Sequence, residues 1–243
     1  MQASWLGYFS DDVLERDRQK GPKGFQRGRG ARDLNIPVII LGAGGHGRVV
    51  LDLLKSLGHE AAGFIDRNQV LWGQLIDGVP VIGGDDEILK KPPGEIRLAM
   101  GLGGVGDNRP RMSLYEMFCA RGYLFPCFFH PSSIVSGTAS TGGASMVMAG
   151  VVIQTGCIVG KNVIINTGAL VDHDCSIGDH VHIAPGAVLS GGVTVGSGAH
   201  IGTGAVVIQN IHIGEDAVVA AGAVIVRDVS RGSVVMGVPG RER

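Results

Sequence analysis

The sequence has no cysteines at C-x-x-C spacing, no apolar run long enough to cross a membrane and no marked net charge. Its four cysteines therefore give no sign of a zinc-finger site, and we expect them to be reduced thiols. The N-terminus lacks the apolar core of a signal peptide, and a formal net charge of −1 gives no reason to expect a nucleic-acid partner. We expect a soluble cytoplasmic protein that binds neither membranes nor nucleic acid.

Glycine, by contrast, is abundant, with 41 residues in a chain of 243 that is 44% apolar and only 5% aromatic. Because no collagen-like triplet accompanies it, this excess predicts many tight turns between short strands. The length suffices for one large domain or two small ones. Residues 1–34 differ in composition, with clustered basic residues and glycines, and we expect a poorly ordered extension without an assigned function.

A strand, a glycine-rich turn, a helix and a second strand are predicted between residues 36 and 66. The apolar run I-P-V-I-I-L is typical of a buried parallel strand. The turn G-A-G-G-H-G (42–47) follows it and leads into a helix expected at 48–57, which Gly58 should close, and the second strand ends at Asp66. Glycines at this spacing let the backbone approach a phosphate at the helix N-terminus, where free N–H groups favour an anion. Residues 35–130 are therefore predicted to form a Rossmann-like α/β domain.

Three interpretations of the turn remain open: the phosphate of a nucleotide other than NAD, NAD itself with Asp66 on a ribose, or packing alone. Only about sixty residues follow before the pattern changes, which is short for a full dinucleotide fold, and such a fold has no particular use for His46. A second glycine-rich exit, G-L-G-G-V-G (101–106), follows another predicted strand, so both loops should face one site. Arg109 and Arg111 open the next predicted helix, either reaching phosphates or solvated, and a last strand is expected at 124–129.

A period of six dominates the remainder, which we assign to residues 131–243. From Val135 to Ile225, fifteen of sixteen positions are Ile, Leu or Val, and only Thr141 departs. A small or branched residue stands four positions after each of them. Such a repeat predicts a parallel β-helix with coils of eighteen residues. Cys157 and Cys175 would then stack inward as unbridged, buried side chains.

The repeat also predicts the direction in which the histidine side chains point. It directs His173 outward between Asp172 and Asp174, and a carboxylate beside an imidazole can orient its tautomer and raise its basicity. On spacing alone, a general base and an ordinary surface histidine remain equal alternatives. His180, His200 and His212 are expected at the surface. No histidine spacing indicates a metal site, and none is predicted.

Residues eighteen apart should lie one above another, so Pro185, Thr203 and Ala221 form a column of small side chains. Such a column leaves room for an extended ligand, and we call it the lane. His182 lies near its foot, with His200 stacked above.

Several motifs together resemble one family, the sialic-acid O-acetyltransferases and bacterial UDP-4-amino-sugar N-acetyltransferases with hexapeptide repeats. The matching motifs are G-A-G-G-H-G (42–47), F-I-D-R (64–67), A-M-G (99–101), N-T-G-A-L-V-D-H-D-C (166–175), H-I-A-P-G-A (182–187) and G-V-P-G (237–240). The resemblance implies a left-handed β-helix and a homotrimer with acetyl-CoA bound between neighbouring prisms. Its general base matches His173 and the acid beside that base matches Asp174.

The resemblance also implies acetyl-CoA contacts at His182, Thr203 and Ala221. It places the nucleotide of a UDP-sugar at Gly44, Gly45, His46, Asp66, Arg67 and Gly101. The chain departs from the family at Gly240, where alanine is usual, in the additional glycines of 101–108, and in residues 1–34, which have no counterpart.

The expected activity is direct, acetyl-CoA-dependent N-acetylation of a UDP-linked 4-amino-4,6-dideoxy sugar for surface glycans or glycoproteins. O-acetylation of sialic acid or a related sugar is the first alternative. A non-catalytic, nucleotide-binding assembly protein is the second. Cys175 is excluded as a nucleophile because the repeat directs it inward.

Overall fold

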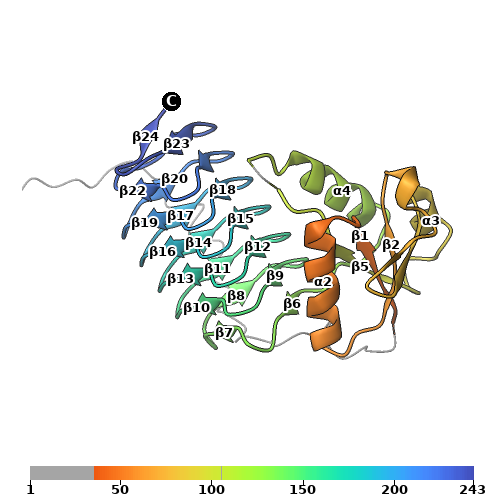
Figure 1. Ribbon diagram of the computed structural model, residues 1–243. Helices are drawn as coiled ribbons and strands as arrows, with labels where there is room; N and C mark the ends of the chain where they lie inside the picture. The colour runs from red at the N-terminus through yellow and green to blue at the C-terminus, as the bar shows by residue number, and fades with distance from the viewer. Residues whose placement is uncertain (1–35, 105) are drawn as a thin grey trace, which may run out of the picture.

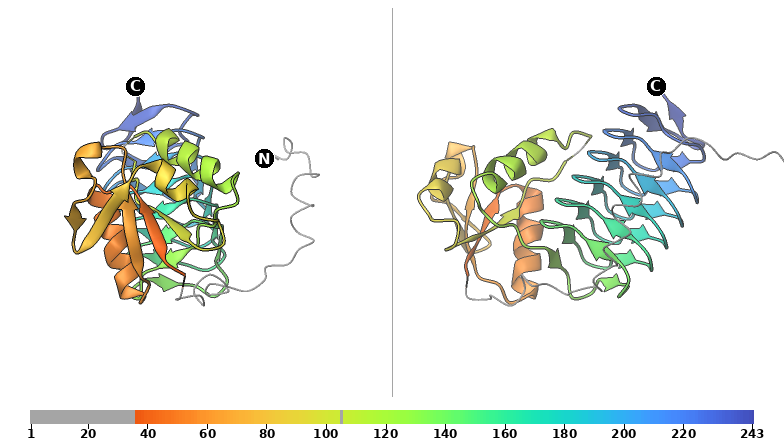
Figure 2. Two further views of the ribbon diagram at one scale, coloured as in Figure 1. Left: turned by 90° about the vertical axis from the view of Figure 1, so that its right-hand side faces the viewer. Right: turned by 180° about the vertical axis from the view of Figure 1, so that it is seen from behind.

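The computed structural model describes residues 36–104 and 106–243, and the extension predicted at 1–34 lies outside this range. The chain forms two parts, a sheet with helices and a long triangular prism of stacked coils (Figure 1). Figure 2 shows that helix α2 lies between the sheet and the lower coils of the prism. No helix within the described residues is both long and apolar enough to cross a membrane.

The first part contains a five-stranded sheet in the order β3-β4-β2-β1-β5. Its elements are β1 (Val38–Leu41), α2 (Gly45–Ser56), β2 (Ala61–Ile65), η1 (Gln69–Leu71), β3 (Leu75–Ile76), β4 (Val79–Gly83), α3 (Asp85–Leu89), β5 (Arg97–Met100) and α4 (Arg109–Cys119). β1 pairs in parallel with both β2 and β5 and is buried along its whole length, which explains its continuous apolar run. The chain crosses the sheet between β4 and β5, so the edge between the ends of β1 and β5 is a switch point suited to ligands.

Helix α2 begins at Gly45, three residues before the expected Arg48, and glycines determine both its ends. Near its start, a Cβ on Gly47 would collide with the carbonyl oxygen of Gly42, so only glycine allows this close approach. At its end Gly58 has a φ of 75°. The N–H groups of Gly58 and His59 donate to the carbonyls of Lys55 and Leu54 at 3.1 and 3.0 Å, which is a Schellman motif. The prediction that Gly58 closes this helix is confirmed.

The prism has three parallel sheets, which we name by their outer surfaces. The covered sheet comprises β6 (Phe128–Phe129), β9 (Met146–Val147), β12 (Ile164–Ile165), β15 (His182–Ile183), β18 (His200–Ile201), β21 (Val218–Val219), β23 (Val234–Met236) and the antiparallel β24 (Arg241–Glu242). The apolar sheet comprises β7 (Ile134–Val135), β10 (Val152–Ile153), β13 (Leu170–Val171), β16 (Val188–Leu189), β19 (Val206–Val207) and β22 (Val224–Ile225). The polar sheet comprises β8 (Ser140–Thr141), β11 (Ile158–Val159), β14 (Ser176–Ile177), β17 (Thr194–Val195) and β20 (His212–Ile213).

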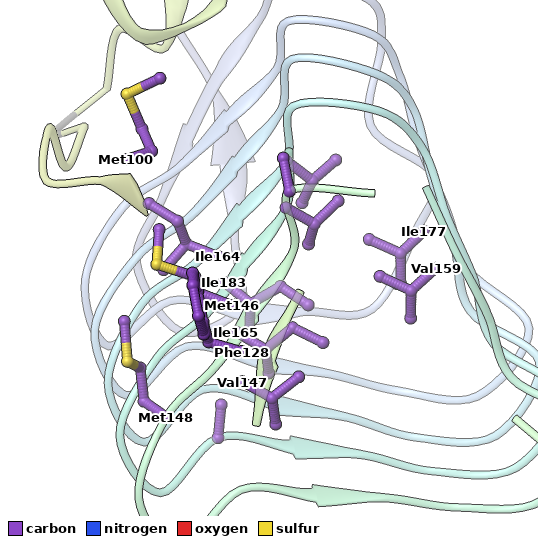
Figure 3. Packing of buried hydrophobic residues seen from close by; sticks show 14 of the residues in the cluster. Met100, Phe128, Met146, Val147, Met148, Val159, Ile164, Ile165, Ile177 and Ile183 are labelled. Carbon is purple, nitrogen blue, oxygen red and sulfur yellow. The ribbon is translucent and has the colours of Figure 1, made fainter. Parts of the chain in front are cut away.

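Each strand pairs with the strand eighteen residues away along most of the prism, as in the alignment of Val152 with Leu170. The second residue of each strand carries the period of six, and from Val147 to Ile225 all of these residues are buried. Figure 3 shows Val159 and Ile177 directed into the prism from one side of the coils. Cys157 and Cys175 are buried and unbridged, as predicted.

The prediction of a final strand at 124–129 is wrong in its extent and in its sheet. Only Phe128 and Phe129 form a strand, and they pair with β9 of the prism. Leu124 still accepts a hydrogen bond from the N–H of Leu98 in β5 at 3.0 Å, but the chain then leaves the first sheet. An apolar run alone does not show which of two sheets the strand joins. The domain boundary at residue 130 stays a prediction.

The outer surfaces of the three sheets differ because the first residue of each strand points outward. On the covered sheet Phe128, Met146 and Ile164 are outward yet buried, since the first part of the chain packs on them. Figure 3 shows Met146 and Ile164 on the side of the coils near Met100. On the apolar sheet the outward residues are all aliphatic, and Ile134 and Leu170 remain 67% and 41% exposed. The covered sheet therefore already has a partner within the chain, whereas the apolar sheet has none among the residues that the structure describes.

Candidate active site

A cavity of about 400 Å³ lies at the carboxyl ends of β1 and β5. Both glycine-rich loops line it, as the position of the switch point predicts. All of the residues predicted to bind the nucleotide sugar line this cavity: Gly44, Gly45, His46, Asp66, Arg67 and Gly101. We call it the acceptor cavity.

The start of α2 gives this cavity an anion-binding character. Nothing lies within 4 Å of the positions where Cβ atoms of Gly44 and Gly45 would be, so the backbone there is open to a ligand. The first turn of α2 contains no acidic residue, and its free N–H groups favour a phosphate. The carboxylate of Asp66 accepts from the N–H groups of Ala43 and Asn68 at 2.9 and 2.8 Å, so it also fixes the loop in place.

A second cavity of about 410 Å³ lies along the covered sheet, and His182, Thr203 and Ala221 line it together with Pro185. The predicted lane is therefore one continuous surface. His46 and Gly103 line both cavities, so the two are neighbours with a shared wall.

His182 is held in one neutral tautomer. Its Nδ1 lies 2.7 Å from the carbonyl oxygen of Gly104, which can only accept, so Nδ1 carries the proton. Its Nε2 lies 3.3 Å from the amide nitrogen of Asn166. Burial, and then the neighbouring His200, lower the pKa of His182 to about 3. His182 therefore presents a neutral ring to the lane.

The expectation that His180 and His200 lie at the surface is wrong, although His212 is exposed as expected. His200 packs edge-on against His182 with ring centroids 5.0 Å apart, and its Nδ1 is buried with no hydrogen-bond partner among the described residues. His180 packs against Tyr115 of α4 with ring centroids 5.6 Å apart. The repeat identifies outward positions, but it does not show which outward positions the rest of the chain covers.

His173 is outward, as predicted, with 57% of its side chain exposed. Its Nδ1 lies 3.0 Å from a carboxylate oxygen of Asp174, so Nδ1 carries the proton and Nε2 keeps a free lone pair. The hydrogen bond to Asp174, and then the charge of Asp172, raise the pKa of His173 above its ordinary value. An exposed imidazole held in this way has the geometry of a general base.

Gly191 is a site residue that the sequence reasoning missed. A Cβ at this position would collide with Cε1 and Nε2 of His173, so only glycine leaves room for the ring. Its backbone N–H makes no hydrogen bond within the described residues. The signal was present in the sequence, since Gly191 stands eighteen residues after His173 and so lies one coil above it.

A single chain does not bring His173 and the lane together. His173 lies at the corner between the apolar and polar sheets, after β13. Pro185 and the lane lie at the corner between the covered and apolar sheets, before β16. The width of the apolar sheet separates the two corners, and His173 lines neither cavity. No cluster of three or more potential metal ligands occurs among residues 36–104 and 106–243.

Comparison with known proteins connects both parts of the chain to one group of enzymes. Residues 37–118 match the family model of the PglD N-terminal domain, and residues 156–191 and 174–209 match that of the bacterial transferase hexapeptide repeats. The perosamine N-acetyltransferase of Caulobacter crescentus, solved with CoA and GDP-perosamine as a variant of one histidine, is 38% identical over 85% of this chain and 96% of its own, with a TM-score of 0.80. The chain belongs to the hexapeptide-repeat family of sugar N-acetyltransferases.

Two further solved structures of other proteins are also similar to this chain. The acetyltransferase domain of PglB from Neisseria gonorrhoeae, in complex with acetyl coenzyme A, is 38% identical over 85% of this chain and 98% of that domain, with a TM-score of 0.80. WeeI from Acinetobacter baumannii is 27% identical over 86% of this chain and all of its own, with a TM-score of 0.78. No curated protein sequence matches significantly. The prism of the acetyltransferase is a left-handed parallel β-helix of hexapeptide repeats.

Proposed function

We propose that this protein transfers an acetyl group from acetyl-CoA to the amine of a nucleotide-linked amino sugar, with His173 as the general base. The observation that carries the proposal is the Nδ1 contact of His173 with Asp174, which leaves Nε2 as a free, exposed acceptor of a proton. The specific substrate that we propose is a UDP-linked 4-amino-4,6-dideoxy sugar used for surface glycans or glycoproteins. Acetyl-CoA and nucleotide sugars are cytoplasmic metabolites, so we place the reaction in the cytoplasm.

The acceptor cavity supplies what a nucleotide diphosphate requires. The open backbone at Gly44 and Gly45 would receive a phosphate at the start of α2. Asp66 and Arg67 at the end of β2, with Gly101 opposite them, would hold the remainder of the nucleotide. His46 stands in the wall shared with the lane, and burial, then the charge of Arg111, lower its pKa to about 4, so its ring is neutral before a ligand binds.

The lane fits an extended pantetheine arm. Thr203 and Ala221 have short side chains one coil apart, and His182 closes the foot of the lane with a neutral ring. Successive coils rise by about 4.8 Å, so the lane offers an extended ligand a regular path along the prism.

Assembly of the active site requires more than one copy, and we propose a homotrimer. The apolar sheet presents a column of aliphatic residues to solvent, and patches of this kind usually mark an interface. If three copies pack this sheet around a threefold axis, the corner on one side of the sheet in one copy meets the corner on the other side of the sheet in the next copy. The lane lies at one corner and His173 at the other, so each active site would combine the lane of one protomer with His173 of its partner.

The proposed chemical step is direct. The sugar amine attacks the thioester carbonyl carbon, Nε2 of His173 takes the amine proton, and the bond from carbon to sulfur breaks. The CoA thiolate leaves and the proton on His173 returns to it, so no covalent enzyme intermediate forms. Asp174 stabilises the imidazolium during the step. The N–H of Gly191, one coil above His173, makes no hydrogen bond within the described residues and would donate to the developing oxyanion.

The proposal is tested by assaying purified protein with acetyl-CoA and UDP- or GDP-linked amino sugars. We expect His173→Ala to lower kcat by about 10²- to 10⁴-fold, the range of a lost general base, with little change in CoA affinity. Near-normal turnover of this variant would overturn the mechanism.

The nucleotide and the acceptor group need separate tests. Isothermal titration with UDP and with GDP compares the two bases directly, because the Caulobacter relative was solved with a GDP-sugar. Absence of UDP binding would overturn the choice of UDP. The same assay with a hydroxyl acceptor in place of the amine examines the O-acetyltransferase alternative.

A further inference from the structure

One corner of the prism presents a column of backbone carbonyls that the coils themselves do not use. Asn162, His180 and Gly198 are eighteen residues apart at the corner between the polar and covered sheets. Each has left-handed backbone, with φ of 53°, 62° and 74°. None of their carbonyl oxygens accepts a backbone hydrogen bond within the described residues. The column would therefore leave three acceptors unpaired, which is costly where water is excluded.

Two side chains at the start of α4 satisfy this column. The amide nitrogen of Asn108 donates to the carbonyls of Gly198 and Ala199 at 2.9 and 3.1 Å. Arg111 donates through Nη1 to Asn162 and through Nη2 to His180, the latter at 2.6 Å. The three carbonyls of the column thus pair with one end of one helix.

The spacing of the two side chains matches the spacing of the coils. Three residues of an α-helix rise by about 4.5 Å, and neighbouring parallel strands lie about 4.8 Å apart. Asn108 and Arg111 can therefore bind the carbonyls of adjacent coils only when α4 lies at one particular position along the prism axis. A shift by a single coil would place Arg111 where Asn108 now lies, so the pair defines a register.

Packing alone does not explain a buried arginine at position 111. Arg111 is fully buried, its partners are neutral carbonyls, and its Nε has no hydrogen-bond partner in the part of the chain that the structure describes. Sequence reasoning left it as a phosphate contact or a solvated residue, and it is neither. By contrast, the neighbouring Arg109 is exposed and pairs with Asp107 at 2.8 Å. A buried cation without a carboxylate is costly, so its retention calls for a role beyond filling space.

The register controls the wall between the two cavities. Asn108 ends the loop that carries Gly103, which lies against His46, and Gly104, which accepts from His182 at 2.7 Å. Figure 1 shows this loop extending from the sheet toward β15 and β18. The height of α4 on the prism therefore determines where the acceptor cavity opens relative to the lane.

We propose that Asn108 and Arg111 are positioning residues that set the height of the acceptor cavity on the prism, and thereby the rate of acetyl transfer. They would contribute to binding of neither substrate. The proposal rests on the proposed function of the two cavities.

The test compares Asn108→Ala, Arg111→Met and Arg111→Lys with the control Arg109→Ala in the full chain. We expect kcat to fall about 10- to 100-fold in the first two variants, since a displacement of about 1 Å can cost 10²-fold. The dissociation constants of UDP alone and of CoA alone should stay within twofold. Arg111→Lys keeps the charge and donors for the carbonyls, so it should recover part of the rate. Arg109→Ala should match the unchanged protein.

Two results would overturn the proposal: an unchanged kcat in both Asn108→Ala and Arg111→Met, or a loss of ligand affinity as large as the loss of rate. Should Arg111→Met fail to fold, Asn108→Ala carries the test, because it leaves the buried arginine in place. Hydrogen exchange of the amides at 102–104 gives a readout independent of activity and should be faster in the variants. If the unchanged protein transfers no acetyl group, the proposed function fails, and unaltered exchange in the variants then refutes the positioning role separately.

Discussion

At the residue scale, the geometry of His173 predicts a particular pH dependence. A general base must be neutral, so kcat/KM should fall as the pH drops below the raised pKa of His173. Asp174 is the main cause of that rise, and Asp174→Asn should therefore move the inflection to lower pH while reducing the maximal rate. A pH profile of kcat/KM for both proteins measures this shift. An inflection that stayed in place would show that another group controls the profile.

The contact between Gly191 and His173 gives a second residue-scale prediction. In Gly191→Ala the new methyl group would displace the His173 ring, which is the free end of an exposed side chain. We expect kcat to fall at least tenfold with a change in thermal unfolding temperature of less than about 2 °C, because the strand core is untouched. Gly137→Ala is the matched control, since nothing lies within 4 Å of its Cβ position. Equal activity of the two variants would refute the contact.

Buried histidines make stability depend on pH. Burial holds the pKa of His46 at about 4 and that of His182 at about 3, below the unfolded value of 6.5. Between pH 6.5 and the folded-state pKa of each histidine, the unfolded chain binds more protons than the folded chain. The free energy of unfolding therefore falls as the pH drops through 6.5. Each histidine contributes about 1.4 kcal/mol per pH unit in this window. Thermal unfolding from pH 7 to 5 should show a gentler decline for His182→Gln, whereas the exposed His212→Gln should follow the unchanged protein.

At the element scale, the lane predicts a selective effect on one substrate. Ala221→Trp would fill the lane without touching the acceptor cavity. We therefore expect KM for acetyl-CoA to rise at least tenfold while the affinity for UDP alone stays unchanged. Thr194→Trp places the same side chain on the exposed polar sheet and serves as control. A matching rise for the control would mean that the effect is not local.

The elements also show how far sequence reasoning reaches. The period of six identifies the inward positions of the prism, because each coil repeats the same steric environment. Gly58 identifies the C-terminal end of α2, whereas the helix begins three residues before the predicted start, and the two glycine loops meet as their strand order requires. The burial of His180 and His200, the burial of Arg111 and the end of the first sheet could not be predicted this way. Each depends on which surface of the prism the first part covers, and no local pattern encodes that.

At the scale of the whole molecule, a shared active site predicts complementation between inactive variants. His173→Ala lacks a base but keeps the lane, and Ala221→Trp lacks the lane but keeps the base. If equal amounts of the two variants exchange at random around a threefold axis, about one quarter of all sites combine an intact base with an intact lane. Mixing after dissociation should recover up to that share of activity. Activity equal to the sum of the separate variants would contradict a site shared between copies.

The carbonyl column has a consequence for how the chain tolerates change. Every amino acid has a backbone carbonyl, so the hydrogen bonds that Asn108 and Arg111 donate to Asn162, His180 and Gly198 do not depend on the side chains of those residues, although the ring of His180 also packs against Tyr115 of α4. What these positions require is left-handed backbone, which glycine and asparagine adopt readily. Outward side chains of the prism can therefore change while these hydrogen bonds to the first part of the chain persist. The repeating backbone of the prism thus provides α4 with hydrogen-bond acceptors that are retained when the side chains of the column change.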